Sequence, residues 1–194
     1  MPALQIFLHL ITRTLLFTLL IFQPMNAAAL TVGGVTFQES VSIENRQLPL
    51  RGAALLRWLN IFKVYVAALY LPESGAPYDA LADIPKRLEI SYLVSIPGPD
   101  FGKGAEAILE RNNSPEVLAR LRDRIDQLNS VYRDVKPGDR YALTYVPGQG
   151  TELSYNGQPL ITIEGADFAA AYFGIWLGKD PIDLEMRSRL INEG

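Results

Sequence analysis

The stretch LLRWLNIFKVYVAALYLP, residues 55–72, decides the fold of this chain. Its second part, residues 61–71, is apolar at odd and even positions alike, which is typical of a central strand covered on both faces. Arg57 and Lys63 interrupt the apolar residues, and Tyr65 follows the lysine by two positions. A charged side chain that is buried without a partner costs several kcal/mol. The two cations therefore need a partner or water, and they are candidates for a binding site.

The first 29 residues differ in composition from the rest of the chain. They contain no acidic residue, a single arginine and an apolar run that ends at Phe22. Ala27 and Ala29 form a small-residue cleavage site directly before Leu30, as in a secretory signal peptide. The apolar run is shorter than the ~20 residues that a spanning helix needs.

These features predict a cleaved signal peptide over residues 1–29 and one domain over residues 30–194. The alternative is that the first segment stays attached as a membrane anchor. The chain has no cysteine, which fits export to a bacterial periplasm, where an exposed thiol is a liability. We therefore expect a periplasmic protein.

The composition excludes several classes of site. The only histidine, His9, lies in the predicted signal peptide, so the remaining chain has neither histidine nor cysteine for zinc sites, catalytic triads or disulfides. The net charge of −3 weighs against nucleic acid or an anionic membrane surface as the main partner. No clustered carboxylate motif indicates a metal site. We expect no cofactor, no metal and no nucleic acid, and contact with a membrane only through residues 1–29 if they are retained.

Hairpins and helices alternate in blocks along the chain. Gly33 and Gly34 predict a short hairpin over residues 30–37, and RLEISYLVSI (87–96) alternates as a half-buried strand does. Helices are predicted over 99–113, 114–132, 167–178 and 180–191, the last capped by Asp180, and turn signals bracket strands at 140–146, 151–155 and 158–163. This order predicts an α+β fold with a mostly antiparallel sheet and helices over one face.

Four segments together resemble the chalcone isomerase-like family, in its bacterial exported branch. They are GVTF, IFKVYVAALYL, PGDRYALTYVPGQGTELSYNG and FGIWLGKDPIDLEMRSRLI. The resemblance covers nearly the whole chain after residue 29. It implies an open-faced β-sandwich, in which helices back a large antiparallel sheet and a ligand cleft lies between the two layers.

The enzymes of that family are isomerases that close a ring in a phenolic enone by an intramolecular lyase reaction. The resemblance matches their anion-steering arginine to Arg57 and a threonine of the next strand to Tyr65. Phe101 and Ala169 stand where those enzymes carry hydroxyl groups, and Asn112 is the nearest match to their asparagine. Most of the catalytic hydroxyls are thus replaced, so isomerase activity is the alternative and not the main prediction.

Other members of the family bind fatty acids, with an arginine and a tyrosine on the carboxylate, and the resemblance assigns these roles to Arg57 and Tyr65. The guanidinium fork and the phenol are suitable donors for a carboxylate. Lys63, on the same strand parity as Tyr65, and Tyr92, on the apolar face of the next strand, are further candidates. The main prediction is a non-catalytic periplasmic protein that binds a fatty acid or a similar apolar anion, such as a phenolic compound.

The same residues also have structural interpretations. Arg57 can pair with an internal acid or lie in water at the strand entrance, Tyr65 can be a core residue, and a lysine near a strand end usually extends to solvent. Trp58 and Trp176 can line a pocket or simply pack. The whole cleft can also be filled by side chains, which would make the domain structural or partner-binding.

Overall fold

The structure is a computed structural model that describes residues 29–59, 61–73 and 80–192. The strands are β1 (Ala29–Val32), β2 (Val35–Gln38), β3 (Ser40–Ile43), β4 (Arg46–Trp58), β5 (Phe62–Tyr70), β6 (Lys86–Tyr92), β7 (Arg140–Val146), β8 (Gly150–Tyr155) and β9 (Gln158–Ile163). The helices are α2 (Gly98–Asn112), α3 (Pro115–Asn129), α4 (Ala166–Leu177) and α5 (Leu184–Ile191). The predicted signal peptide lies outside the described residues, apart from Ala29 at the start of β1.

The sheet is an antiparallel meander of seven strands in the order β3-β4-β5-β6-β7-β8-β9. The β1–β2 hairpin forms a separate two-stranded ribbon. Every strand of the meander pairs with its neighbour in the sequence, because hairpins connect them or, between β6 and β7, the helices α2 and α3. The α+β fold with an antiparallel sheet backed by helices is confirmed.

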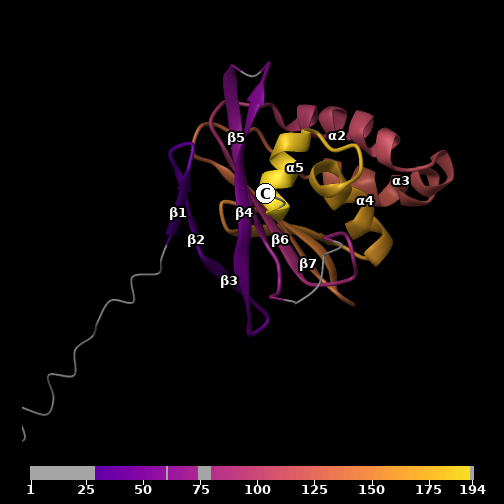
Figure 1. Ribbon diagram of the computed structural model, residues 1–194. Helices are drawn as coiled ribbons and strands as arrows, with labels where there is room; N and C mark the ends of the chain where they lie inside the picture. The colour runs from indigo at the N-terminus through magenta and orange to yellow at the C-terminus, as the bar shows by residue number, and fades with distance from the viewer. Residues whose placement is uncertain (1–28, 60, 74–79, 193–194) are drawn as a thin grey trace, which may run out of the picture.

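The two faces of the sheet are covered by different layers. Figure 1 shows the helices on one side of the sheet and the β1–β2 hairpin on the other. On β5, Tyr65, Ala67 and Leu69 belong to the core under the helices. The alternate residues Val66, Ala68 and Tyr70 pack in the second core, toward the hairpin. The prediction that this strand is covered on both faces is therefore confirmed.

Three features of the fold differ from the sequence prediction. The long strand β4 was not anticipated, and the strand predicted over 87–96 ends at Tyr92. The last helix begins at Leu184, because the Asp183 carboxylate accepts the Met186 N–H at 2.6 Å and caps it. Asp180, the predicted cap, instead exchanges backbone hydrogen bonds with the Asn112 side chain.

No helix in the described part of the chain is long and apolar enough to cross a membrane.

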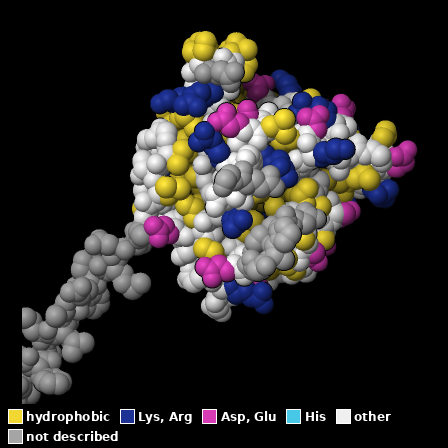
Figure 2. Space-filling view, viewed as in Figure 1, with side chains coloured by type: hydrophobic (Ala, Val, Ile, Leu, Met, Phe, Trp, Pro, Cys, Tyr) yellow, Lys and Arg dark blue, Asp and Glu magenta, His cyan; other side chains and the backbone are white. Residues whose placement is uncertain are grey.

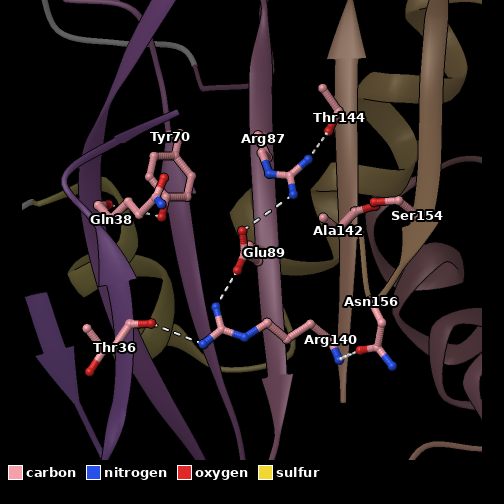
Figure 3. A network of polar contacts seen from close by, with 10 residues as sticks. All are labelled: Thr36, Gln38, Tyr70, Arg87, Glu89, Arg140, Ala142, Thr144, Ser154 and Asn156. Atoms are coloured by element: carbon pink, nitrogen blue, oxygen red, sulfur yellow. Dashed lines mark hydrogen bonds and ion pairs between the residues drawn. The ribbon is translucent and has the colours of Figure 1, made fainter. Parts of the chain in front are cut away.

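A polar network ties the hairpin to the outer face of the sheet (Figure 3). Glu89 on β6 forms ion pairs with Arg87 on its own strand and with Arg140 on β7. The guanidinium of Arg140 also donates to the Thr36 carbonyl on β2 at 3.0 Å, and it stacks 5.0 Å from the centre of the Phe37 ring. The network therefore fixes the β1–β2 hairpin on the outer face of the sheet, while the helices cover the opposite, inner face.

Candidate functional site

An apolar cavity of about 220 Å³ lies between the inner face of the sheet and the helices. Strands β5 to β8 form its floor, and α2, α4 and the residues around them form its walls. The lining consists of Val64, Tyr65, Ile90, Tyr92, Ile96, Asp100, Phe101, Gly104, Ala105, Ile108, Tyr132, Tyr141, Leu143, Leu153, Tyr172, Ile175, Trp176 and Ile182. The cleft is thus only partly filled by side chains.

The exposed members of the lining mark the mouth of the cavity. They are Asp100 and Gly104 on α2 and Ile182 in the segment before α5. Asp100 is also the only charged residue of the lining within the described part of the chain. The volume exceeds the ~150 Å³ of an engineered cavity that holds benzene and is below the ~300 Å³ at which drug-sized sites begin. The cavity as it stands therefore suits a short or medium acyl chain, or a single ring.

Among the described residues five tyrosines line this cavity, and the hydroxyls of three of them bond to one another or to the backbone. The hydroxyls of Tyr132 and Tyr172 bond to each other at 2.9 Å. The Tyr141 hydroxyl accepts the Arg133 N–H at 2.7 Å and donates to the Arg133 carbonyl at 3.1 Å. These three side chains shape the wall, but their polar atoms already have protein partners.

The hydroxyls of Tyr65 and Tyr92 bond to neither another tyrosine nor the backbone, and each O–H has no acceptor among the described residues; in the Tyr132–Tyr172 pair only the accepting hydroxyl has such an O–H. Tyr65 and Tyr92 stand directly opposite each other on β5 and β6, with ring centroids 5.8 Å apart. The Trp176 indole N–H donates to the Tyr65 hydroxyl at 2.9 Å, which leaves the proton of that hydroxyl free to donate. Both side chains are almost fully buried, and both line the cavity. The pair can therefore donate two hydrogen bonds to an oxygen atom in the cavity.

The acid–base character of the pair follows from burial. Burial raises the pKa of the Tyr65 phenol far above its ordinary value, despite the opposing hydrogen bond from Trp176. The pKa of Tyr92 is raised mainly by burial and further by the neighbouring tyrosines. Both phenols are neutral at physiological pH. They are suited to donate hydrogen bonds and unsuited to act as general bases.

Arg57 and Lys63 do not join this pair. They are exposed, and with Leu55, Gly33 and residues near the start of α5 they line a separate pocket of about 260 Å³. For Lys63 the physical reason is a β-bulge: Leu56 pairs with Tyr65, but Arg57 pairs with Lys63, so Val64 is an extra residue on β5. A bulge reverses the alternation of side chains along the strand.

The bulge explains why strand parity failed here. Val64 lines the cavity beside Tyr65, although regular alternation would direct Val64 away and Lys63 inward. Arg57 alternates with Leu56, which packs on the cavity side, so Arg57 lies with Leu55 on the opposite side. The predicted grouping of Arg57 and Lys63 with Tyr65 and Tyr92 is therefore not what the structure shows.

Other positions singled out in the sequence divide between the cavity and the rest of the molecule. Phe101 does face the cavity and stacks on Tyr132 with ring centroids 4.8 Å apart. Ala169 is buried but is not part of the lining, and Trp58 is exposed. Three tyrosines of the lining, Tyr132, Tyr141 and Tyr172, were not predicted from the sequence, because they come from three separate parts of the chain. The only sequence signal for them was the high number of tyrosines, nine in the chain.

In the described residues, no group of histidine, cysteine or acidic side chains is arranged to hold a metal ion. The polar chemistry of the cavity therefore rests on its tyrosines, the Trp176 indole and Asp100 at the mouth.

Comparison with known proteins agrees with this architecture. The crystal structure of the Arabidopsis thaliana fatty-acid binding protein AtFAP1 superimposes with a TM-score of 0.65 at 14% sequence identity, over 86% of this chain and 97% of that one. This likeness concerns the fold. Among curated protein sequences, no relative matches the chain. The sequence profile of the chalcone isomerase-like family matches residues 29–192. The chain belongs to the chalcone isomerase-like family.

Proposed function

We propose that this protein is a non-catalytic binder of a fatty acid or a similar acyl-chain ligand, which it takes into the cavity between sheet and helices. The observation that carries the proposal is the apolar cavity with two unused phenol donors, Tyr65 and Tyr92, at its floor. The fold likeness to a plant fatty-acid binding protein supports it.

In this proposal the acyl chain fills the apolar space and the carboxyl group accepts hydrogen bonds from Tyr65 and Tyr92. The described residues of the lining include no lysine or arginine, so an ionised carboxylate would lose its hydration without gaining a cation. The affinity should therefore decrease as the pH rises above the pKa of the free acid, about 4.3 for an aliphatic carboxyl group, by up to tenfold per pH unit.

The test is a titration of decanoic acid into the wild-type protein and three variants. Tyr65→Phe and Tyr92→Phe each remove one hydrogen bond, which is worth ~0.5–1.5 kcal/mol between neutral groups, or about two- to twelvefold in affinity. Arg57→Ala should leave the affinity unchanged, because Arg57 lines the other pocket. A large loss in Arg57→Ala with a flat pH dependence would instead assign the carboxylate to Arg57, outside the cavity.

We also propose that the protein works in the periplasm after removal of residues 1–29. The support is the A-x-A sequence before Leu30 after a short apolar run. N-terminal sequencing of the protein from the periplasmic fraction should begin at Leu30. Recovery of an intact Met1 in the membrane fraction would contradict both the cleavage and the location.

A further inference from the structure

We propose that the turn between β4 and β5 is a docking tip for the surface of a phospholipid bilayer that contains anionic lipid. The tip consists of Trp58, Leu59, Ile61 and Phe62. This inference does not depend on the proposed function of the cavity, because it rests on a different surface and concerns a different partner.

The tip exposes large apolar side chains that have no role in the core. Trp58 is 63% exposed, Leu59 65%, Ile61 73% and Phe62 57%. Figure 2 shows apolar side chains projecting at the top of the molecule, where the β4–β5 hairpin ends in Figure 1. Single exposed apolar residues are ordinary, but a contiguous group of this kind marks an interaction site.

The backbone of the turn is built to display these residues. The Ile61 N–H donates to the Trp58 carbonyl at 3.1 Å, and the rings of Trp58 and Phe62 pack across the hairpin with centroids 6.0 Å apart. Leu59 has a φ of 50°, a left-handed conformation that is uncommon for a residue other than glycine or asparagine. The Leu59 side chain is exposed, so burial in the core does not offset the cost of this backbone conformation. Core packing therefore does not explain why a leucine stands at this position.

Two cations, Arg57 and Lys63, lie next to the apolar tip on β4 and β5. Arg57 and Lys63 pair across β4 and β5, are exposed, and make no ion pair with any residue that the structure describes. Two acids share their pocket but are already engaged: the Asp183 carboxylate caps α5, and Glu185 pairs with Arg189 at 2.7 Å. The net charge of the chain is negative, but the charge at this tip is positive.

This combination fits a bilayer better than it fits a protein groove. Tryptophan and phenylalanine with aliphatic neighbours enter the boundary between headgroups and acyl chains, while lysine and arginine behind them contact anionic headgroups. The tip projects from the surface (Figure 2), and the pocket behind it is lined by Arg57 and Lys63 and not by the apolar residues of the tip. A bilayer accepts a convex apolar tip without a matching shape.

The tip also lies close to the mouth of the cavity. Val64 follows Lys63 and lines the cavity, while Ile182 lies at the mouth. Asp183, the next residue, lines the pocket that contains Arg57 and Lys63, and Leu184 beside it is 67% exposed. A docked tip would therefore bring the cavity mouth near the lipid. This departs from the expectation that only residues 1–29 would contact a membrane.

The test uses the whole chain and its tryptophan emission. The chain has two tryptophans, Trp58 in the tip and Trp176 in the cavity wall. In the Trp176→Phe variant all emission comes from Trp58. Vesicles of phosphatidylethanolamine and phosphatidylglycerol should move this emission to shorter wavelength, and brominated phospholipid should quench it. Residues 1–28 contain no tryptophan, so the signal reports the tip even where that segment also meets lipid.

Matched variants separate the tip from the rest of the molecule. In Trp58→Phe, the emission of Trp176 should not respond to vesicles; if Trp176→Phe does not fold, the difference between the wild-type and Trp58→Phe spectra gives the Trp58 signal. Replacing Arg57 and Lys63 with alanine should weaken binding about 25-fold on anionic vesicles, at about fivefold per cation. Replacing Arg120 and Arg122, exposed on α3, should not weaken it.

Three results would overturn the proposal. The first is Trp58 emission that stays unshifted and unquenched with vesicles. The second is a shift that depends on protein concentration without vesicles, which would assign the tip to a second copy of the chain. The third is an equal loss of binding in the Arg120 and Arg122 variant. Because no fatty acid is present in this experiment, its failure and the failure of the cavity proposal are distinguishable.

Discussion

Tyr65 and Tyr92 show how much the environment of one residue decides its chemistry. All five tyrosines of the cavity have the same side chain, but Tyr141 both accepts and donates a hydrogen bond, and Tyr132 and Tyr172 bond to each other. The remaining two face each other across β5 and β6 with unused O–H groups. The sequence predicted both of them: Tyr92 from the alternation of its strand, and Tyr65 from the resemblance to the chalcone isomerase-like family.

The buried tyrosines predict a loss of stability at alkaline pH. Burial raises the pKa of Tyr65, Tyr92 and Tyr172 above the ordinary value of about 10. The stability that their neutral forms contribute is fully present below pH ~10 and is lost as the pH rises toward the raised values in the folded protein. Each phenol lowers the free energy of unfolding by up to ~1.4 kcal/mol per pH unit.

Urea unfolding between about pH 8 and 11 checks this prediction. The wild-type free energy of unfolding should be level and then decline above pH ~10, and the decline should be shallower in Tyr92→Phe. The same slope in both proteins would show that Tyr92 ionises as freely in the folded state as in the unfolded one.

Substitution of Glu89 measures how much the polar network on the outer face of the sheet contributes to the free energy of unfolding. Glu89 is 15% exposed and lies between two guanidinium groups, so Glu89→Gln leaves Arg87 and Arg140 next to each other without an anion. We expect a loss of ~1–3 kcal/mol, which lowers the melting temperature by ~2–4 °C per kcal/mol in a domain of this size. Glu106→Gln is the control, because its ion pair with Arg122 is half-exposed and should contribute little.

At the scale of elements, the sequence predicted those segments that carry a clear local signal. The strands β5, β7, β8 and β9 and the helix α3, with its Ser114 cap, lie close to their predicted positions. The strand β4 was missed because its residues change partner from β3 to β5 and its burial does not alternate regularly. The bulge at Val64 has no sequence signal at all, and it was this bulge that turned Lys63 away from the cavity, whereas Arg57 lies outside it by ordinary alternation with Leu56.

We expect one substitution in the helix α4, Gly174→Ala, to stabilise the protein. Gly174 lies in the buried interior of this helix, yet an added Cβ would meet no atom within 4 Å. Gly174→Ala should therefore raise stability by ~0.5–1 kcal/mol, because alanine loses less backbone entropy on folding than glycine. Gly52→Ala provides the contrast: its Cβ would lie 2.1 Å from the Arg189 carbonyl oxygen and push β4 away from α5.

Thermal unfolding of the two glycine variants measures this directly. The melting temperature should rise for Gly174→Ala and fall for Gly52→Ala. A fall for Gly174→Ala would mean that the space beside α4 is filled, which would also weaken the case for open volume under that helix.

At the scale of the whole molecule, the fold gathers two surfaces at one end. Helices over the inner face of the sheet leave a cavity lined mainly by apolar and aromatic side chains, and the hairpin beside its mouth ends in an exposed apolar tip. The site combines β5, β6, β7, β8, α2, α4 and the turn after α3. Residues from so many elements meet only after folding, so Tyr132, Tyr141 and Tyr172 could not be assigned from the sequence.

The central claim is that an acyl chain occupies the cavity, and one comparison by titration calorimetry tests it most directly. Gly104→Phe places a ring at the cavity mouth, where an added Cβ meets nothing within 4 Å. Lys103→Phe adds the same ring one residue away, at a side chain that is 76% exposed and outside the lining. Displacing two methylene groups from the cavity costs ~1.6 kcal/mol, which is more than tenfold in affinity.

We predict that the wild-type protein and Lys103→Phe bind one decanoic acid each with equal affinity, and that Gly104→Phe binds it more than about tenfold more weakly. Equal affinity in all three folded proteins would show that the ligand lies elsewhere, and no binding to the wild-type protein would contradict the account altogether.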